Sequence, residues 1–370
     1  MLSVSRNTVD RAYMQLTLEG YIESRQNAGF YVLKMLKAFQ SERTLTEPIL
    51  KTEAKSDDDH IVYDLTNSSH TSNLFPKKVW KKHYQNALDE LDKAEQLSTL
   101  QPFQGEYKLR KEISRYLERI RGVKCHPDQI IITSGLQQSL NYICQFLGNT
   151  KRSVLMEDPS YPKAREIFKK NAYPIVTAEV DEKGLDLTKV DRSSEIEMIY
   201  TTPSHQFPLG MIMPISRRRE LLSFAEAHNS FILEDDYDSE LRYYQRPIPA
   251  LKSIDYLGRV IYLGTFSKIL SPSFRMGYMV LTEQFTESFL EKFKLYNSTV
   301  NLLNQIALAN ILSSGDYDRL VCKMNHVFKK RYEAFKKEFE QSNLTARNSP
   351  TSKVAGCKGF GLVQGLAPCA

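Results

Sequence analysis

Cysteine is scarce in this sequence, and its few occurrences form no metal-binding or disulfide pattern. Five cysteines stand among 370 residues, and no two of them have the C-x-x-C spacing typical of zinc and redox sites. An odd number of cysteines also argues against a disulfide framework and favours a reducing compartment. The pattern predicts a cytoplasmic protein without a metal site.

Long apolar runs and a targeting segment are missing too. No stretch of about 18 uninterrupted apolar residues occurs, which excludes a spanning helix. The N-terminal segment MLSVSRNTVDRAY lacks the apolar centre of a secretory signal. We therefore expect no membrane partner.

Charge of one sign is not strongly in excess. The formal net charge is +6 and the isoelectric point about 8.8, which permits a polyanionic partner without requiring one. Hydrophobic residues at 41% and charged residues at 25% exclude disorder across the whole chain. At roughly 150 residues per domain, the length predicts about two domains.

The first 34 residues predict the second half of a winged helix-turn-helix. Ser5 can cap a helix over residues 6–19, and two short strands follow at residues 21–25 and 30–33. Thirty-four residues are too few to fold alone, so we expect the first helices of such a domain upstream of Met1.

A linker is predicted over residues 35–60. Its second half is polar and charged, has few aromatic residues and ends in three aspartates. A solvated helix is the alternative interpretation.

Strands and helices then alternate, which predicts an α/β fold with a mostly parallel sheet. Apolar strands are expected at residues 129–133, 153–157, 197–201, 231–234, 260–263 and 277–281, and helices at 136–147, 163–170, 217–228 and 317–340. Ligands of such sheets bind beyond the carboxyl ends of the strands, so the residues that follow each strand are the candidates for function.

A lysine follows the strand at 260–263. Lys268 has Thr265 and Ser267 before it and Arg275 after it, which suits an amine that forms a Schiff base beside a phosphate site. The alternative is a surface lysine in a serine-rich loop.

An acidic run, Asp235-Asp236-Tyr237-Asp238, follows the strand at 231–234. One carboxylate there can pair with a protonated pyridine nitrogen, and the tyrosine can reach the neighbouring ring oxygen. A magnesium site and an ordinary turn are the alternatives.

Three further strand ends carry weaker signals. Ser134 and Gly135 open a helix and form either an anion cradle or an N-cap. Tyr161 either stacks on a planar cofactor or belongs to the core beside two prolines. His205 and Gln206 either contact a ring substituent or are structural.

The order of these features along the chain resembles a known family. The segments ITSGLQQSL, MEDPSYP, TTPSHQFPLG, ILEDDYDSELRY and YLGTFSKILSPSFRMGYM are similar to the fold-type-I, aspartate-aminotransferase-like domain of MocR-type regulators, in the GntR superfamily. The segment LSVSRNTVDRAYMQLTLEGYIESRQNAGFYV resembles the recognition helix and wing of their DNA-binding domain.

The resemblance implies pyridoxal 5'-phosphate as cofactor and a role for each matching residue. Lys268 forms the internal aldimine, Asp235 pairs with the ring nitrogen, Tyr237 binds the 3-oxygen and Tyr161 stacks on the ring. The remaining implied cofactor contacts are the phosphate ligands Ser134, Gly135, Leu136, Thr265 and Arg275, and the turn residues His205 and Gln206, where plain aminotransferases carry an asparagine that this sequence lacks.

The resemblance also implies two macromolecular partners. DNA is one, contacted by Ser5, Arg6, Asn7, Thr8 and Arg25. The other is a second copy of the chain, with residues 63–69, 73–80 and 297–301 as candidate interface segments.

Two departures from the family pattern bear on function. Residues 1–34 hold four basic and three acidic residues, a net charge of +1, which is a weak electrostatic footprint for DNA. The family carries an arginine near its C-terminus for the ligand carboxylate, whereas residues 349–370 contain none and form an atypical tail. We expect an aminotransferase-like domain over residues 61–348 with an incomplete small part, and a chain truncated at both ends.

Three functions are compatible with these observations. The first is a DNA-binding regulator that senses an amino compound through an external aldimine at Lys268. The second is an aminotransferase that acts on an amino acid with the same lysine. The third is an inactive remnant of such a regulator.

Overall fold

The computed structural model describes residues 4–33, 74–94, 100–148, 152–191, 194–242 and 248–341. The chain divides into two compact units, Met1–Asp64 and Leu65–Ala370. The predicted linker at 35–60, the tail at 349–370 and the candidate interface segment at 63–69 lie outside the described residues. Within the described ranges, no helix has both the length and the apolar character needed to span a membrane.

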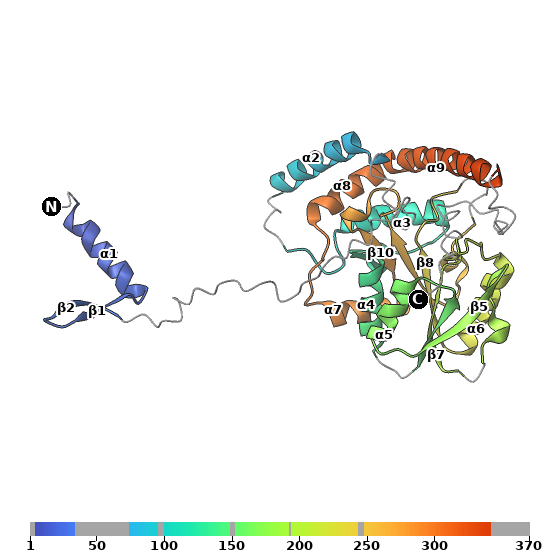
Figure 1. Cartoon of the computed structure of the whole chain (residues 1–370), viewed down its shortest axis with the longest axis horizontal. Helices are drawn as coiled ribbons and strands as arrows, with labels where there is room; N and C mark the ends of the chain where they lie inside the picture. Colours follow the sequence, from blue (N-terminus) through green and yellow to red (C-terminus); the bar gives the residue numbers. More distant parts are fainter. Residues whose placement is uncertain are drawn as a thin grey trace. The chain divides into compact units, whose positions relative to one another are not determined.

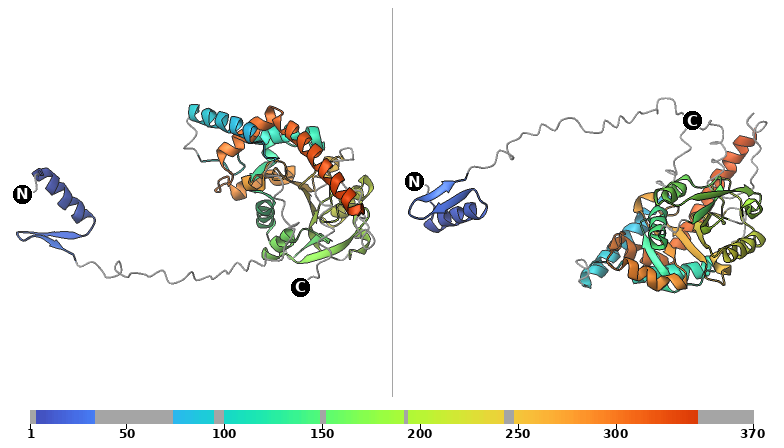
Figure 2. Two further views of the ribbon diagram at one scale, coloured as in Figure 1. Left: turned by 45° about the horizontal axis from the view of Figure 1, so that its top comes forward. Right: turned by 90° about the horizontal axis from the view of Figure 1, so that it is seen from below.

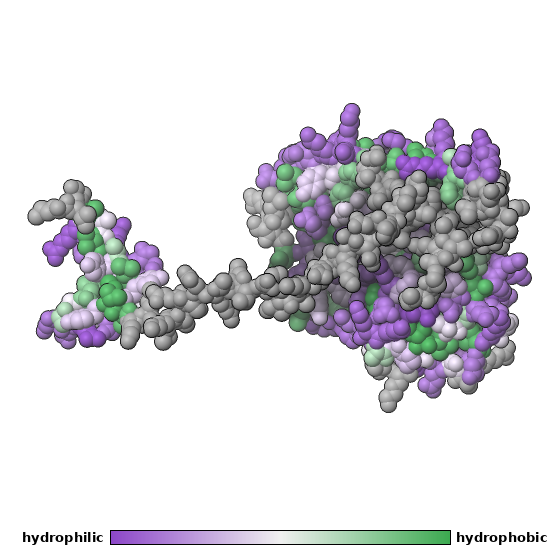
Figure 3. All heavy atoms as spheres, in the orientation of Figure 1, coloured by the Kyte–Doolittle hydropathy of each residue, from purple (hydrophilic) through white to green (hydrophobic). Residues whose placement is uncertain are grey.

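The first unit is the predicted helix followed by a hairpin. Helix α1 (Arg6–Leu18) begins at Ser5, whose Oγ accepts a hydrogen bond from the Thr8 backbone N–H at 3.3 Å. Strands β1 (Ile22–Arg25) and β2 (Gly29–Val32) pair antiparallel. The described part of this unit buries almost nothing beyond Ile22, and Figure 3 shows apolar side chains over α1 and the hairpin. Packing within these residues alone therefore contributes little to stability.

The second unit is built on one eight-stranded, mostly parallel sheet. The mostly parallel sheet was predicted, whereas the strands at residues 175–181 and 184–185 were not. Its strands in spatial order are β3 (Ile130–Thr133), β10 (Gly277–Val280), β9 (Val260–Thr265), β8 (Phe231–Asp236), β7 (Ile196–Thr201), β4 (Ser153–Asp158), β5 (Ile175–Asp181) and β6 (Gly184–Leu185). Strands β4, β5, β7, β8 and β9 run parallel, and β10 runs antiparallel to both of its neighbours.

Helices cover both faces of the sheet (Figures 1 and 2). They are α2 (Lys77–Lys93), α3 (Tyr107–Arg121), α4 (Leu136–Leu147), α5 (Pro162–Lys170), α6 (Ile215–Ala227), α7 (Glu283–Phe293), α8 (Leu302–Ser313) and α9 (Asp316–Gln341). Of these, α2, α3, α7 and α8 were not anticipated from the sequence. Hydrophilic side chains gather on the outer surface of α2 and α9 (Figure 3).

Alternation along the strands divides the core between the two faces. Tyr200 on β7 and Leu233 on β8 pack in one hydrophobic cluster with Phe168 of α5 and Phe289 of α7. Ile232, the residue before Leu233 on β8, belongs to a different cluster that includes Leu221 of α6. Successive side chains of a strand point to opposite faces of the sheet, so the residues of β8 alternate between the two hydrophobic clusters.

Two strands extend further than the sequence predicted. Strand β8 continues to Asp236 instead of ending at Glu234, and β9 continues to Thr265 instead of Leu263. Asp235 and Asp236 are therefore strand residues, and their side chains face opposite layers of the fold.

Candidate functional site

The register of β10 brings together segments that are more than a hundred residues apart. Gly277, the first residue of β10, pairs with Thr133 at the end of β3 and with Thr265 at the end of β9. Because β10 is antiparallel to both strands, its beginning lies beside their carboxyl ends. Arg275, two residues earlier, therefore enters the space between the segments that follow β3 and β9.

An anion cradle lies at this point, at the start of α4. Gly135 is the N-cap residue, with φ of 116° and no side-chain cap, and a Cβ built on it would lie 3.6 Å from Nη2 of Arg275. The first N–H groups of a helix have no partner within the helix. Together with the Arg275 guanidinium they make a site that fits a phosphate.

Ser134 does not cap α4, so the N-cap alternative for this residue is wrong. Its backbone N–H donates to Oε1 of Gln138 at 2.6 Å, and Gly135 holds the cap position. The backbone of Ser134 is thus engaged with α4 itself, and its hydroxyl is the group that remains for a phosphate contact, which stays a prediction.

Lys268 is carried on a tight turn that directly follows β9. The Leu270 N–H donates to the Phe266 carbonyl at 2.9 Å, and Phe266, Ile269 and Leu270 are all buried. Those three apolar side chains fix the turn and leave Lys268 partly buried on its other side. No hydrogen bond or ion pair joins Lys268 Nζ to another residue in the described part of the chain.

Asp235 lies on the face of β8 that it shares with Leu233. The residue is 5% exposed, and its Oδ2 accepts a hydrogen bond from the Tyr200 hydroxyl at 2.5 Å. Burial, and after it the neighbouring Asp235 carboxylate, raises the pKa of Tyr200 well above its ordinary value of 10.0. The phenol therefore stays protonated and acts as the donor.

Three aromatic rings from three different strand ends lie in a row. The ring centroids of Tyr161 and Phe207 are 5.4 Å apart, and those of Phe207 and Tyr237 are 6.3 Å apart, both edge to face. Burial raises the pKa of Tyr161, and the Asp235 carboxylate adds to the increase while Arg275 opposes it. Tyr161 is thus within electrostatic reach of both predicted cofactor ligands, and Phe207 joins the row without having been predicted to do so.

His205 and Gln206 are buried in the turn after β7, where their side chains make structural contacts. His205 Nδ1 lies 2.7 Å from Oδ1 of Asp238. The Gln206 amide donates to Oε2 of Glu157 at 3.2 Å and to the Pro159 carbonyl at 2.8 Å. These contacts fasten the turn to the acidic run and to the loop that carries Tyr161. Direct contact of either residue with the cofactor stays a prediction.

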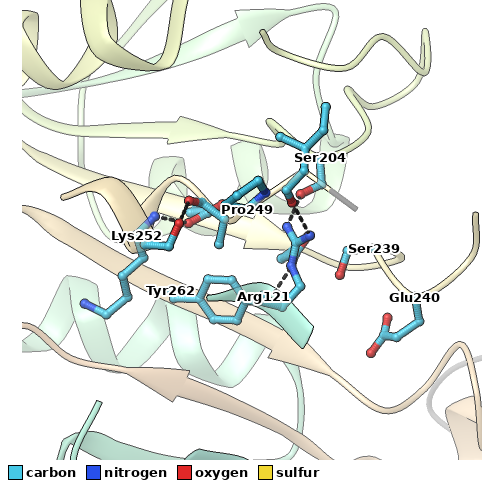
Figure 4. Close-up of polar contacts among 12 residues, drawn as sticks. Arg121, Ser204, Ser239, Glu240, Pro249, Lys252 and Tyr262 are labelled. Atoms are coloured by element: carbon cyan, nitrogen blue, oxygen red, sulfur yellow. Dashed lines mark hydrogen bonds and ion pairs between the residues drawn. The ribbon is translucent and has the colours of Figure 1, made fainter. Parts of the chain in front are cut away.

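The acidic run contains one member of a buried ion pair that was missed from the sequence. Arg121, at the end of α3, donates from Nε to Oδ2 of Asp236 at 2.8 Å and from Nη2 to Ser204 Oγ at 2.6 Å. Tyr262 donates to the same Asp236 oxygen, and Figure 4 shows Arg121 between Tyr262 and Ser204. These partners hold the pKa of Asp236 below its ordinary value in spite of burial. The pair ties α3 and the turn after β7 to the end of β8.

The predicted DNA-contacting residues lie at two places in the first unit. Ser5 and Thr8 form a capping pair at the start of α1, with their hydroxyls 2.9 Å apart. Arg25, at the end of β1, donates to Oε1 of Glu23 at 2.5 Å and lies 4.5 Å above the ring of Tyr31. Contact of these residues with DNA, and of the exposed Arg6 and Asn7, stays a prediction.

The described residues show no group of three or more histidine, cysteine or acidic side chains placed to hold a metal ion. The strand-end site thus consists of an amine, an anion cradle, a carboxylate and an aromatic row. This combination fits a planar, phosphorylated cofactor that reacts with amines.

Comparison with known proteins gives matches along most of the chain. The family described as aminotransferase class I and II matches residues 65–355. The uncharacterized HTH-type transcriptional regulator YdeL of Bacillus subtilis (strain 168) is 37% identical over 353 residues, which cover 94% of this chain and 75% of that protein. The probable rhizopine catabolism regulatory protein MocR of Rhizobium meliloti is 33% identical, with 90% and 69% covered.

Solved structures give a consistent result for the second unit. The kynurenine aminotransferase of Pyrococcus horikoshii, solved in complex with PMP, has a TM-score of 0.65 and 28% identity, with 73% of this chain and 68% of that chain covered. LysN, the α-aminoadipate aminotransferase of Thermus thermophilus, was solved with N-(5'-phosphopyridoxyl)-L-leucine and has a TM-score of 0.66 and 26% identity, with 74% and 69% covered.

Proposed function

Because the chain belongs to the MocR-type transcriptional regulators, which carry an aminotransferase class I and II domain, we propose that it binds DNA and senses a primary amine at the site around Lys268. The cofactor of this domain is pyridoxal 5'-phosphate. When bound, it supplies an aldehyde that condenses reversibly with amines and a ring that withdraws electrons. We propose the domain limits predicted from the sequence: DNA-binding segment 1–34, linker 35–60 and cofactor domain 61–348.

The residues present fit this cofactor, and each has a separate task. Arg275 and the N–H groups at Gly135 hold the phosphate, because they form the anion cradle between β3 and β10. Asp235 would hold a proton on the ring nitrogen of the bound cofactor, and Tyr161 would offer its ring as a stacking partner. Lys268 offers its amine to the aldehyde, since its turn follows β9 beside the cradle. A primary amine from solution then competes with Lys268 for the same carbon.

The observation that carries the regulatory proposal is the presence of a helix and wing in the same chain as this site. Helix α1 exposes Arg6 and Asn7 in its first turn, and recognition helices read the major groove with such N-terminal residues. The net charge of +1 over residues 1–34 gives one copy little affinity for DNA. We therefore propose a homodimer that binds two half-sites, acting in the cytoplasm where DNA is accessible.

Coupling between the two units is the functional core of the proposal. An amine that binds at Lys268 changes DNA affinity only if it binds one arrangement of the dimer better than another. His205 in the turn after β7 and Asp238 in the acidic run are cross-linked, so these two segments would move together when an effector displaces either of them.

The second candidate function is a true aminotransferase. The specific observation in its favour is that both solved structures described above are aminotransferases, which this chain matches over 73% and 74% of its length. Lys268 would then also take the α-proton of the amino acid as a general base and return it as a general acid.

Absorbance spectroscopy with added pyridoxal phosphate tests the site. We expect a visible band in the wild type that borohydride removes, and no such band in Lys268→Ala. Lys323→Ala is the matched control, because Lys323 is an exposed lysine on α9 and keeps the band. A folded wild-type protein without the band would overturn both the regulator and the enzyme and leave the inactive remnant.

Titration with primary amines then separates the two functions. A regulator changes its DNA affinity in gel-shift or anisotropy measurements when a particular amine changes the band, and it releases no keto acid. An aminotransferase consumes an amino acid and a keto acid over many turnovers, and its DNA affinity is irrelevant to the rate. Turnover without DNA binding would overturn the regulatory proposal.

A further inference from the structure

We propose that Tyr200 is a positioning residue that fixes the Asp235 carboxylate and thereby sets how firmly that carboxylate holds a proton on the cofactor's ring nitrogen. The inference rests on the proposed function, because Asp235 is there the partner of the ring nitrogen. It assigns a role to a tyrosine that lies inside strand β7 and not in a segment that follows a strand.

The sheet register brings the two side chains together. Strands β7 and β8 are parallel neighbours, and Tyr200 is paired with Leu233. Asp235 is two residues beyond Leu233 on β8, so its side chain points to the same face of the sheet as Tyr200. The Tyr200 hydroxyl reaches Oδ2 of Asp235 at 2.5 Å, the short distance typical of a hydroxyl that donates to a carboxylate.

Packing holds the Tyr200 ring in this position. The side chain is completely buried, and the ring meets Phe168 of α5 edge to face at a centroid distance of 5.9 Å. A ring enclosed in this way cannot follow Asp235 if the carboxylate moves, so the hydroxyl acts as a fixed donor. The carboxylate must therefore align with Tyr200 and with the ring nitrogen at the same time.

Other ionisable groups near the pair come from the neighbouring elements. Glu157 lies at the end of β4 and interacts electrostatically with Tyr200, and burial raises the pKa of Glu157. Tyr161 at the start of α5 interacts with Asp235, and Arg275 before β10 interacts with Tyr161. All of these groups remain in a Tyr200→Phe variant.

The effect of removing the hydroxyl has a definite sign. A donated hydrogen bond stabilises the Asp235 anion, so its loss makes the carboxylate more basic and less well placed. Both changes reduce the positive charge on the ring. Less positive charge raises the proton affinity of the nitrogen at which the ring is joined to Lys268. The pH midpoint of the cofactor's visible band therefore moves upward.

The test is a pH titration of the visible band in Tyr200→Phe. We expect an upward shift of about one pH unit, the order of a hydrogen bond to a charged group, with the borohydride-labelled fraction unchanged. Tyr173→Phe is the matched control. Tyr173 is also buried, but its hydroxyl donates to the backbone carbonyl of Gly148, so the control keeps the wild-type midpoint.

A Tyr200→Phe midpoint equal to that of the wild type overturns the inference and leaves the proposed function intact. A wild type without a visible band overturns the proposed function and this inference together. The route through Asp235 is tested by adding Tyr200→Phe to Asp235→Asn. A further shift of the same size on that background also overturns the inference, because Tyr200 would then act independently of Asp235.

A second variant covers the case in which Tyr200→Phe does not fold. Replacement of Tyr200 by 3-fluorotyrosine keeps the ring and the hydroxyl and makes the phenol a stronger donor. The midpoint is then expected to move downward, and an unchanged midpoint overturns the inference.

Discussion

The guanidinium of Arg275 lies on the side of Gly135 where a side chain would be attached. A Cβ on Gly135 would lie 3.6 to 3.9 Å from three atoms of that guanidinium, and Gly135 has φ of 116°. A cation and the start of a helix thus face the same small volume, from strands β10 and β3 that are far apart in sequence.

Arg275→Ala is expected to weaken pyridoxal phosphate binding about 10- to 100-fold, because charge-assisted hydrogen bonds to the phosphate are lost. The dissociation constant is measured by titration of the visible band. Pyridoxal, which lacks the phosphate, serves as the control ligand and should bind the variant and the wild type equally. Equal losses for both ligands would show that Arg275 does not hold the phosphate.

Gly135→Ala is expected to lower the free energy of unfolding by about 1–3 kcal/mol, because an alanine at this backbone conformation is strained. It should also reduce cofactor affinity, since the new methyl group occupies the cradle. Gly258→Ala is the control: Gly258 has φ of 66° and open space around it, so that variant loses some stability and no affinity. Retained affinity in Gly135→Ala would remove Gly135 from the site.

The sequence predicts which segments carry this site, because each combines a buried apolar run with glycine, proline or acidic residues, although β8 and β9 each end two residues later than predicted. The register of β10 could not be predicted from the sequence. It depends on pairing with β3 and β9 together, and no local pattern around Gly277 encodes which strands will flank it. The approach of Arg275 to Gly135 is for that reason a property of the fold.

Buried polar partners were the other feature that local patterns did not reveal. Tyr200 lies in an apolar strand, where a tyrosine is ordinarily interpreted as a core residue. The hydrogen bond from its hydroxyl to Asp235 depends on the parallel pairing of β7 and β8. Arg121 ends an amphipathic helix, where a basic residue is ordinarily solvated. Its partner Asp236 lies 115 positions later, so only the tertiary structure shows the pair.

The Arg121–Asp236 pair is expected to be important for stability. Arg121→Met leaves Asp236 buried without its cation and should lower the free energy of unfolding by about 3–5 kcal/mol. The Arg121→Met/Asp236→Asn double variant should lose less than the sum of the single variants. Urea denaturation measures both.

Arg119→Met is the matched control on the same helix. Arg119 forms an exposed ion pair with Asp318 at 2.7 Å, so this variant should lose less than about 1 kcal/mol. Equal losses for Arg119→Met and Arg121→Met would contradict the assignment of the buried pair.

Glu240 is expected to make stability depend on pH. Burial, and after it the neighbouring Asp236, raises its pKa from 4.5 to about 7, and the Tyr116 and Tyr317 hydroxyls lie 3.2 and 3.5 Å from its Oε1. The folded state therefore binds the proton more tightly. The contribution of the protonated carboxyl is complete below pH 4.5 and is lost as pH rises toward 7.

Glu240→Gln removes this titration. Its free energy of unfolding should match that of the wild type near pH 4 and exceed it by about 3 kcal/mol above pH 7, with the change between those values. Glu166→Gln, at an exposed surface position, should show no such difference. Parallel pH profiles for Glu240→Gln and the wild type would rule out the raised pKa.

Arg6 and Arg25 are expected to contribute unequally to DNA binding. Arg6 is exposed at the first position of α1, whereas Arg25 already bonds to Glu23 and lies over Tyr31. Arg6→Ala should therefore weaken binding to a duplex selected from a random-sequence pool. It should also lower the slope of log affinity against log salt concentration by about 1, the value for one lost phosphate contact. Arg25→Ala should change both quantities less.

Arg11→Ala is the control for the face of α1 that reads DNA. Arg11 is five residues after Arg6, so at 3.6 residues per turn it points about 140° away around the helix. Arg11 is exposed, like Arg6, and carries the same charge. If only the first turn of α1 enters the groove, Arg11 lies away from the phosphates. Circular dichroism should show that both variants remain folded. Equal changes in salt slope for Arg6→Ala and Arg11→Ala would then mean that DNA attracts this unit by net charge alone. Helix α1 would in that case have no defined orientation in the groove.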